Sequence, residues 1–324
     1  MQRDRPKPSG ARHRRVLHAL LLGVACAAVG LLPLLAISGN AHAAKWGKEY
    51  LPNVDVVDHH GRPLKFFDDL IDGKIVVISF IYTSCRSVCP LAISRLRDAR
   101  DLLGEDGRSK ISFISISIDP IPDTPEKLSQ YAAAFNVDSG WTFVTGDPAN
   151  IDLIRYRLGE RSGAVISLHK NEVLMFNEPT GAWSRDSAFS DIGVLAMNIR
   201  AMHPPWRDVA ATHVELPAGM VADPDRPGQA LFAKACAGCH TIGNGRKVGP
   251  DLAGVTTRRS AEWITRYVTA PEKVRTAGDP IAAELRQAYP NIRMPSLGLS
   301  ETDAADVIAY LTARTAEHKA TLDH

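Results

Sequence analysis

The motif Cys236-Ala237-Gly238-Cys239-His240 constrains the C-terminal third of this chain more than any other feature of the sequence. With this Cys-x-x-Cys-His spacing, two thiols can form thioethers to one haem while the adjacent histidine ligates the haem iron. The motif therefore predicts a one-electron redox centre, around which this part of the chain has to fold. The alternative is a redox or zinc-binding dithiol that happens to precede a histidine.

The motif supplies one axial ligand of the iron, His240, and low-spin electron transfer needs a second, usually Met or His. We predict Met294, which precedes a proline in a polar-flanked loop, whereas a structural Met is expected on an apolar helix face. The competing candidates, His318 and His324, lie at the C-terminus, where chains fray. An iron with His and Met ligands has a raised potential and no open position, so we expect it to carry electrons and not to bind oxygen.

Segments on both sides of the motif extend the pattern. They are Gly228 to Phe232, Val248 to Leu252, Asn291 to Pro295, and an alanine-rich helix that contains Tyr310. From about 220 to 316, the chain resembles class I cytochrome c, which implies an all-α fold and covalent haem c. The resemblance also implies that the carbonyl of Pro250 accepts a hydrogen bond from the His240 ring. It further implies that Phe232 and Tyr310 pack where the first and last helices cross.

Two further cysteines, Cys85 and Cys89, lie far upstream, in a region where strand-like and helix-like patterns alternate. Lys74 to Tyr82 is an apolar, β-branched run, Ile111 to Ile118 has another pattern typical of a buried strand, and Cys89 to Leu103 has helical spacing. This alternation predicts an α/β domain from about residue 50 to 203. Further strands are predicted at Trp141–Thr145, Val173–Phe176 and Ala182–Phe189, and further helices after Thr124, after Asp147 and from Asp191 to Met202.

The spacing of Cys85 and Cys89 suits a shared chemical task. Residues at i and i+4 on one helical face can direct both sulfurs to one metal ion. We expect the positive end of the predicted helix to favour thiolates, which both metal binding and disulfide exchange require. The pair is therefore predicted to be two metal ligands or a redox-active dithiol.

An imidazole would complete a metal site with this pair. Two thiolates and one imidazole form a soft site suited to copper, whereas zinc usually needs a fourth ligand. We predict His169, because its loop precedes the strand Val173–Phe176 and can reach back to a strand-helix corner. The other histidines considered lie in a solvent-facing turn or beside a predicted linker: His59, His60, His203 and His213.

Three more stretches surround these residues: Ser79 to Cys85 followed by Cys89-Pro90, Ser117 to Pro120, and Asp123 to Pro125. Together with the His169 loop they resemble the SCO/SenC family of copper proteins, which assist cytochrome oxidase assembly and have a thioredoxin-like fold. The resemblance implies that Cys85, Cys89 and His169 are copper ligands. Leu168 stands where the family commonly has Asp. Asp119 either orients a ligand or a partner, or only initiates a turn before a proline.

The first 44 residues predict export from the cytoplasm. Residues 1–15 carry six Lys or Arg and one acid, and an apolar stretch from Val16 to Ile37 leads to Ala41-His42-Ala43, which fits a signal-peptidase site. Residues 1–44 are thus a cleaved signal peptide or, since about 20 apolar residues can span a bilayer, a membrane anchor. The rest of the chain holds 32 basic and 35 acidic residues, a net charge of −3 that argues against nucleic-acid binding.

Prolines interrupt the sequence after His203, and no periodicity is sustained there, so a linker is predicted at 204–219. It separates the α/β domain at 50–203 from the cytochrome domain at 220–316, and a tail is predicted at 317–324. The chain is thus expected to hold an α/β thioredoxin-like domain followed by an all-α cytochrome c domain.

Two redox centres in one chain suggest a joint function. Copper changes valence by one electron, as a haem does, whereas a disulfide needs two. We expect an exported, periplasmic copper metallochaperone for cytochrome c oxidase assembly, whose fused haem passes electrons to the copper and dithiol site. Its expected partner is the copper subunit of the oxidase or another periplasmic redox protein.

Two alternatives stay open. One is an enzyme, a thiol-disulfide oxidoreductase that uses Cys85 and Cys89 and is recharged through the haem. The other is an electron carrier that its copper domain docks to an oxidase.

Overall fold

The computed structural model describes residues 47–86, 88–162, 169–206 and 227–322. The predicted signal peptide or anchor at 1–44 lies outside these ranges, as does the predicted linker beyond residue 206. No helix within the described ranges is both long enough and apolar enough to cross a membrane.

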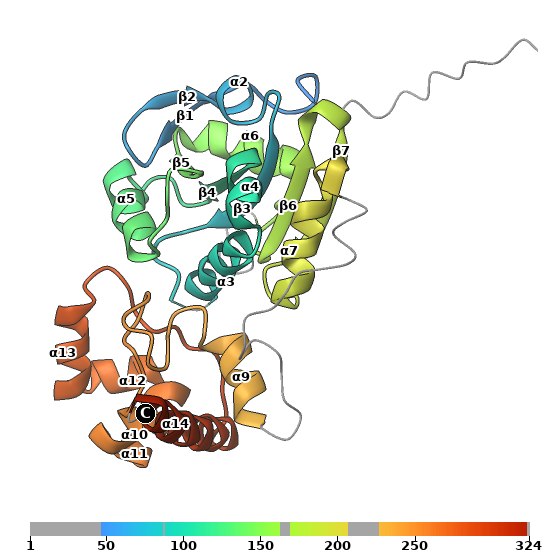
Figure 1. The fold of residues 1–324 in the computed structure, drawn as a ribbon. Helices are drawn as coiled ribbons and strands as arrows, with labels where there is room; N and C mark the ends of the chain where they lie inside the picture. The colour runs from blue at the N-terminus through green and yellow to red at the C-terminus, as the bar shows by residue number, and fades with distance from the viewer. Residues whose placement is uncertain (1–46, 87, 163–168, 207–226, 323–324) are drawn as a thin grey trace, which may run out of the picture. The chain divides into compact units, whose positions relative to one another are not determined.

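A seven-stranded mixed sheet forms the centre of the N-terminal domain, with strand order β2-β1-β5-β4-β3-β6-β7 (Figure 1). Its three middle strands pair in parallel: β3 (Ile75–Ile81), β4 (Ile111–Ser117) and β5 (Trp141–Thr145). The outer strands pair antiparallel: β1 (Asp55–Asp58), β2 (Pro63–Lys65), β6 (Glu172–Asn177) and β7 (Ala182–Ser187). Parallel pairs need crossover helices, so this topology confirms the predicted α/β class.

Within the described residues, helices and 3₁₀ turns lie between these strands and after the last of them. They are α2 (Phe66–Leu70), α3 (Cys89–Asp101), α4 (Gly104–Lys110), α5 (Pro125–Ala134), α6 (Pro148–Leu158), α7 (Ile192–Ala201), η2 (Glu178–Thr180) and η3 (Pro204–Trp206). The helix expected to run to Leu103 ends at Asp101, and α4 was not expected. The predicted start of α5 is confirmed, because Thr124 caps it by accepting a hydrogen bond from the Lys127 amide.

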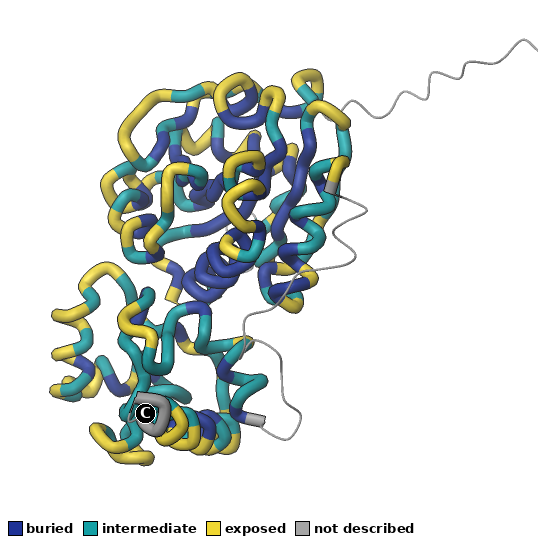
Figure 2. Tube along the Cα trace, in the orientation of Figure 1, coloured by how far each residue is buried: buried dark blue, intermediate teal, exposed yellow. Residues whose placement is uncertain are grey.

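Helices cover both faces of the sheet, and each face has its own apolar core. Every residue of β3 is buried (Figure 2), and its alternate side chains point to opposite faces. Val77 and Ile81 join a core with α3, α5 and α7, whereas Val76 and Ile78 join a second core with α2 and α6. Burial on both faces explains why the strand sequence is continuously apolar instead of alternating.

The described part of the C-terminal domain is entirely helical, as predicted. Its helices are α9 (Pro227–Ala235), α10 (Val255–Arg258), α11 (Ala261–Thr269), α12 (Pro271–Thr276), α13 (Pro280–Ala288) and α14 (Glu301–Leu322). Ser300 caps α14 by accepting from the Asp303 amide at 3.1 Å, while its own amide donates to the Asp303 carboxylate at 2.8 Å. The helix continues to Leu322, so most of the stretch predicted as a tail is helical.

The crossing of α9 and α14 depends on a glycine. The rings of Phe232 and Tyr310 lie 5.5 Å apart in a small core at this crossing. A Cβ atom at Gly228 would lie 2.0 Å from the backbone oxygen of Asp306, closer than any real contact. Only glycine lets the two backbones approach this closely.

Gly228→Ala should therefore force the two helices apart and destabilise the C-terminal domain. We expect a loss of about 1–3 kcal/mol, typical of overpacking, measured as a lower midpoint of thermal unfolding of the haem-loaded chain. Gln287→Ala, on the exposed side of α13, is the matched control and should unfold like the wild type. Equal midpoints for both variants would contradict the close approach.

Candidate haem and metal sites

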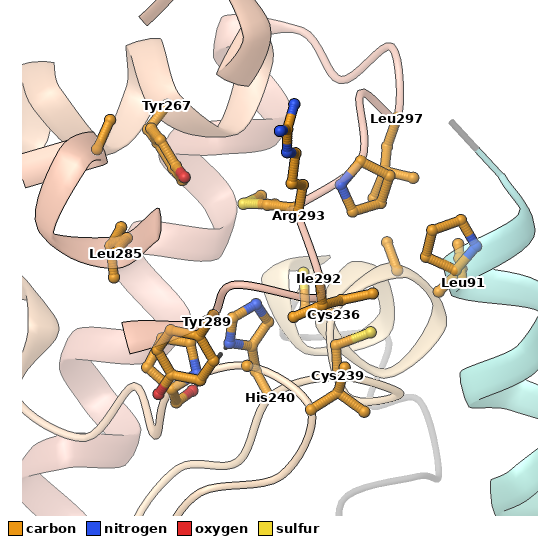
Figure 3. Close-up of a pocket in the computed structure, with 18 of the residues that line it drawn as sticks. Leu91, Cys236, Cys239, His240, Tyr267, Leu285, Tyr289, Ile292, Arg293 and Leu297 are labelled. Atoms are coloured by element: carbon orange, nitrogen blue, oxygen red, sulfur yellow. Dashed lines mark hydrogen bonds between the residues drawn. The ribbon is translucent and has the colours of Figure 1, made fainter. Parts of the chain in front are cut away.

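The Cys-x-x-Cys-His motif forms a tight turn directly after α9. The amide of Cys236 donates to the carbonyl of Phe232 at 2.8 Å, and the amides of Cys239 and His240 donate to the carbonyl of Cys236 at 3.0 and 2.9 Å. This winding brings both sulfurs and the imidazole to the wall of one cavity (Figure 3). The three predicted haem-attachment residues therefore face a common space.

The cavity is mostly apolar and suits a large, flat ligand. The space between its walls measures about 950 Å³ when the open solvent at its mouth is included. Its lining includes Val248, Tyr267, Leu285, Ile292 and Leu297, together with Met294. Apolar walls with few polar groups are typical of cofactor sites.

The His240 ring is held ready to ligate a metal through Nε2. Its Nδ1 lies 2.9 Å from the carbonyl oxygen of Pro250, so Nδ1–H is the donor and Nε2 keeps its lone pair. Burial lowers the pKa of His240, which favours the neutral imidazole that a metal requires. The hydrogen bond that the resemblance implied for Pro250 is thus present.

Gly249 permits this contact, although the sequence analysis gave it no role of its own. A Cβ atom there would lie 2.6 Å from Cε1 of His240. The amide of Gly249 also donates to the carbonyl of Cys239 at 2.8 Å, which ties the loop to the motif. Gly249 therefore lets the backbone approach the His240 ring closely, and Pro250 accepts a hydrogen bond from the same ring.

Met294 lies between α13 and α14, in a segment without regular structure, and lines the same cavity as His240. Its carbonyl accepts a hydrogen bond from Nη1 of Arg275 at 3.1 Å, and Arg275 pairs with Glu272 at 2.7 Å. Arg275 fixes the backbone of the Met294 loop, and the sequence analysis missed it. An arginine can stabilise an irregular loop in this way because its fork offers several donors.

The two motif cysteines are neutral thiols in the haem-free chain. Neither forms a disulfide, and burial raises the pKa of Cys236 to about 12 and also raises that of Cys239. Both sulfurs would therefore lose or transfer a proton on binding a metal or a haem.

The upstream pair lies where β3 gives way to α3. Cys85 follows the strand in a turn in which its amide donates to the carbonyl of Tyr82 at 3.1 Å, and Cys89 is the first residue of α3. The amide of Cys89 donates to Sγ of Cys85 at 3.4 Å. Both cysteines are buried and neither forms a disulfide. The structure therefore brings the two predicted sulfur ligands together.

His169 lies beside this pair. Its Nε2 is 3.4 Å from Sγ of Cys89, and its ring meets the ring of Tyr82 edge to face at 5.8 Å. Burial lowers the pKa of His169, so the ring is neutral. Residue Leu168, where the resemblance departs from the family, lies outside the described residues.

Two sulfurs and one imidazole fit copper by the chemistry of their donors. No group of three or more His, Cys, Asp or Glu side chains within the described ranges is already arranged to hold a metal ion. Cys89 instead contacts each of the other two candidates, Cys85 and His169, separately. Metal binding would therefore require these side chains to turn towards one point.

One expectation about the thiols is wrong. The start of the helix was expected to favour thiolates, but the pKa of Cys89 is raised, first by its hydrogen bond with the Cys85 side chain and then by burial. Backbone hydrogen bonds act in the opposite direction and do not compensate. Metal-free Cys89 is therefore a neutral thiol, and a metal has to displace its proton.

Asp123 is a positioning residue that the sequence analysis left without a role. It is completely buried and accepts hydrogen bonds from the Thr83 amide at 3.0 Å, from the Thr83 hydroxyl, and from the Ser117 hydroxyl at 2.6 Å. Thr83 precedes Cys85 by two residues, so Asp123 ties the end of β4 to the cysteine loop. Asp119, which the sequence analysis considered instead, makes no such contact with the loop; burial raises its pKa.

Tyr82 also contacts the site. Its side chain is hydrogen-bonded to Cys85, and burial together with this bond raises the pKa of Tyr82, which keeps the phenol neutral. A neutral phenol can donate its proton to a sulfur. The only sequence signal was its place in the stretch from Ser79 to Cys85.

Asp123→Asn should weaken the cysteine loop, because an amide cannot accept all three hydrogen bonds that the carboxylate accepts. We expect a loss of about 2–3 kcal/mol in the free energy of unfolding and weaker copper binding. Chemical denaturation and competition against a copper chelator measure the two effects. Asp119→Asn is the control four residues away; if both variants behaved alike, Asp123 would not position the loop.

Copper affinity should rise with pH, because binding displaces a proton from Cys89, whose raised pKa keeps it protonated at neutral pH. Each proton released corresponds to about a tenfold gain in apparent affinity per pH unit. Chelator competition at pH 6, 7 and 8 tests this. A pH-independent affinity would contradict the neutral thiol.

Two family models match this chain. Residues 44–159 match SCO1/SenC, and residues 226–314 match cytochrome c. A protein of Stutzerimonas stutzeri, whose name describes copper binding, is 26% identical over 43% of this chain and 68% of its own length. The SCO1 protein homolog of Bacillus subtilis is 30% identical over 24% of this chain and 39% of its own length. The chain therefore spans well under half of this second relative.

Solved structures resemble part of the chain at low identity. ScoI of Bradyrhizobium japonicum with copper bound is 23% identical, with a TM-score of 0.40, over 46% of this chain and 96% of that structure. Yeast Sco1 with copper bound is 18% identical, with a TM-score of 0.39, over 53% and 98%. Residues 44–159 are therefore similar to the SCO1/SenC family and residues 226–314 to cytochrome c, and the structure places a mixed α/β sheet in the first of these segments and helices alone in the described part of the second.

Proposed function

We propose that this chain is an exported copper metallochaperone for the assembly of a cytochrome c oxidase, with a fused c-type haem that serves the copper site. The observation that carries the proposal is the contact of Cys89 with both Cys85 and His169. The two cysteines lie within the SCO1/SenC match at 44–159, and His169 lies beyond its end. The names of similar proteins, which include copper-bound Sco1 and ScoI, support copper as the metal. Assembly of an oxidase rests on the family alone.

Copper is the cargo in this proposal, and the chain's own groups explain how it could be held and released. Cys85, Cys89 and His169 supply two soft sulfurs and one neutral nitrogen, a set suited to copper. Tyr82 and Asp123 hold the cysteine loop in place. Because metal-free Cys89 is a neutral thiol, reprotonation of this residue favours release of the metal to a partner.

The haem would be attached through Cys236 and Cys239, with His240 and Met294 as axial ligands. When bound, it supplies one-electron transfer. Pro250 orients the proximal ring, Arg275 fixes the Met294 loop, and the apolar cavity walls limit access of water. These residues would hold the group between His240 and Met294 in a largely apolar environment.

Export is proposed from the sequence of the first 44 residues, which combine a basic start, an apolar stretch and an Ala-x-Ala site. A periplasmic location would place the copper site on the side of the membrane where the copper subunit of an oxidase is expected. The proposed partner is that subunit or another redox protein of the same compartment.

Haem-loaded protein should bind one copper ion per chain, and His169→Ala should weaken this binding. Loss of a ligand should cost more than about 100-fold in affinity, since even changes outside the ligand set cost about 10- to 100-fold. His60→Ala, at an exposed histidine, should bind copper like the wild type. Chelator competition measures the affinities, and failure of the intact protein to bind copper would defeat the proposal.

The same pair of variants tests the second candidate function, a thiol-disulfide oxidoreductase. The contact between Cys85 and Cys89 favours this candidate, because two adjacent thiols can form a disulfide. An oxidoreductase does not need the imidazole, so His169→Ala would keep its rate of disulfide exchange with a model disulfide. If His169→Ala lost copper binding while maturation of the client in cells stayed intact, this enzyme would be favoured over the chaperone.

Met294→Ala should lower the haem potential and abolish any sulfur-to-iron absorption band, because a thioether ligand raises the potential. Redox titration and visible spectroscopy of the loaded chain measure both effects. Met197→Ala, in α7 of the other domain, is the control and should leave the spectrum unchanged. An unchanged spectrum in Met294→Ala would refute this ligand.

A further inference from the structure

Helix α3 carries charged side chains that are buried, which needs an explanation. Arg95, Arg97 and Asp98 are only 6%, 7% and 7% exposed. Charged side chains are seldom buried to this extent unless they are paired. The partners of these three residues therefore show what covers this part of the helix.

The partners come in large part from the haem-binding domain, within the single compact unit formed by Ala44–His324. Arg97 donates through Nη2 to the carbonyl of Gly238 at 2.7 Å, between the two haem cysteines. Nζ of Lys247 lies 2.8 and 3.0 Å from the two carboxylate oxygens of Asp98. The carboxylate of Asp98 thus pairs with Lys247 and also with Arg97 of its own helix.

Arg95 completes this set of contacts. Its Nη1 donates to the carbonyl of Lys234 at 3.0 Å, at the end of α9. Its Nε and Nη2 donate to the carbonyls of Ala188 and Ser190 in its own domain, at 2.9 and 2.6 Å. Two nitrogens of the guanidinium, Nε and Nη2, are therefore held by its own domain, and the third, Nη1, donates to the haem-binding domain.

Helix α3 and the haem-attachment loop also approach each other closely. Ser94 Oγ lies 2.9 Å from Sγ of Cys239, and a Cβ atom at Gly238 would lie 3.0 Å from Cβ of Ser94. Glycine at this position of the motif is therefore suited to close contact with α3. Haem attachment itself requires only the two cysteines and the histidine.

A second group of contacts lies at the other end of this surface, beside the copper cysteines. The amide of Ser296, two residues after Met294, donates to the carbonyl of Arg86 at 3.3 Å, and Arg86 lies between Cys85 and Cys89. Pro90 and Leu91, which follow Cys89, line the haem cavity, and Leu91 is seen beside it in Figure 3. Residues next to the copper ligands thus contact the loop of the predicted axial methionine.

We propose that α3 is a built-in docking surface for the haem-attachment loop, held by Arg95, Arg97 and the Asp98–Lys247 pair. This surface keeps the haem site beside Cys85 and Cys89 in solution. The C-terminal domain therefore does not have to diffuse on its linker to reach the copper site. The purpose of this docking rests on the proposed function, whereas the docking itself is independent of it. The partner that this surface fits is therefore the C-terminal domain of the same chain.

The test uses the full, haem-loaded chain with a protease site placed between residues 207 and 226. After cleavage, the two parts of the wild type should co-elute in size-exclusion chromatography. Lys247→Glu, which faces Asp98 with a second negative charge, should weaken their association at least tenfold. Lys247→Arg, which keeps the charge, and Lys273→Glu, which reverses an exposed charge elsewhere in the same domain, should co-elute.

Ser94→Trp is a second disrupting variant on the opposite surface, because the added ring would fall on Gly238. Haem absorption and circular dichroism establish that each variant is folded. Separation of the wild-type parts after cleavage would overturn the proposal, as would co-elution of both Lys247→Glu and Ser94→Trp. Copper titration of the same samples tests the proposed function separately, since chains that bind copper can still fail to dock, and the reverse also holds.

Discussion

The packing of α3 against β3 is the constraint on which both sites depend. Cys85 follows the carboxyl end of β3, and α3 begins at Cys89. The turn between the strand and the helix therefore sets the separation of the two sulfurs. Ile93 and Leu96 anchor the helix in the core of its own domain. With that side of α3 fixed, its charged residues are presented to the haem-attachment loop.

Burial shapes the chemistry at both centres in the same direction. It favours neutral imidazoles at His169 and His240, which can then donate a lone pair to a metal. Burial also raises the pKa of Cys236, and at Cys89 it adds to the effect of the hydrogen bond with the Cys85 side chain, so both residues are neutral thiols. A metal that binds Cys89 therefore has to displace its proton.

Much of the fold could be predicted because local patterns agree with the final structure. Strand β3 is almost entirely apolar and is buried on both faces, and the strand predicted at Ile111 to Ile118 and the helix predicted after Thr124 are both present. Helix α4 was not predicted, because its sequence holds no apolar residue that could set a helical period. Arg275 and Asp123 were overlooked as positioning residues because hydrogen bonds to distant backbone atoms leave no spacing signal in the sequence.

The sequence by itself determined the chemical groups: a Cys-x-x-Cys-His motif, a Cys-x-x-x-Cys pair, and the alternation of strands and helices around them. These follow from covalent spacing and hydrophobic periodicity, which are local properties. Only the tertiary structure decided that His169 lies against Cys89, that Cys89 is a neutral thiol, and that Asp98 meets Lys247. The contacts of His169 and Lys247 join residues 80 and 149 positions apart in the sequence, and the neutral state of Cys89 depends on its hydrogen bond with Cys85 and on burial.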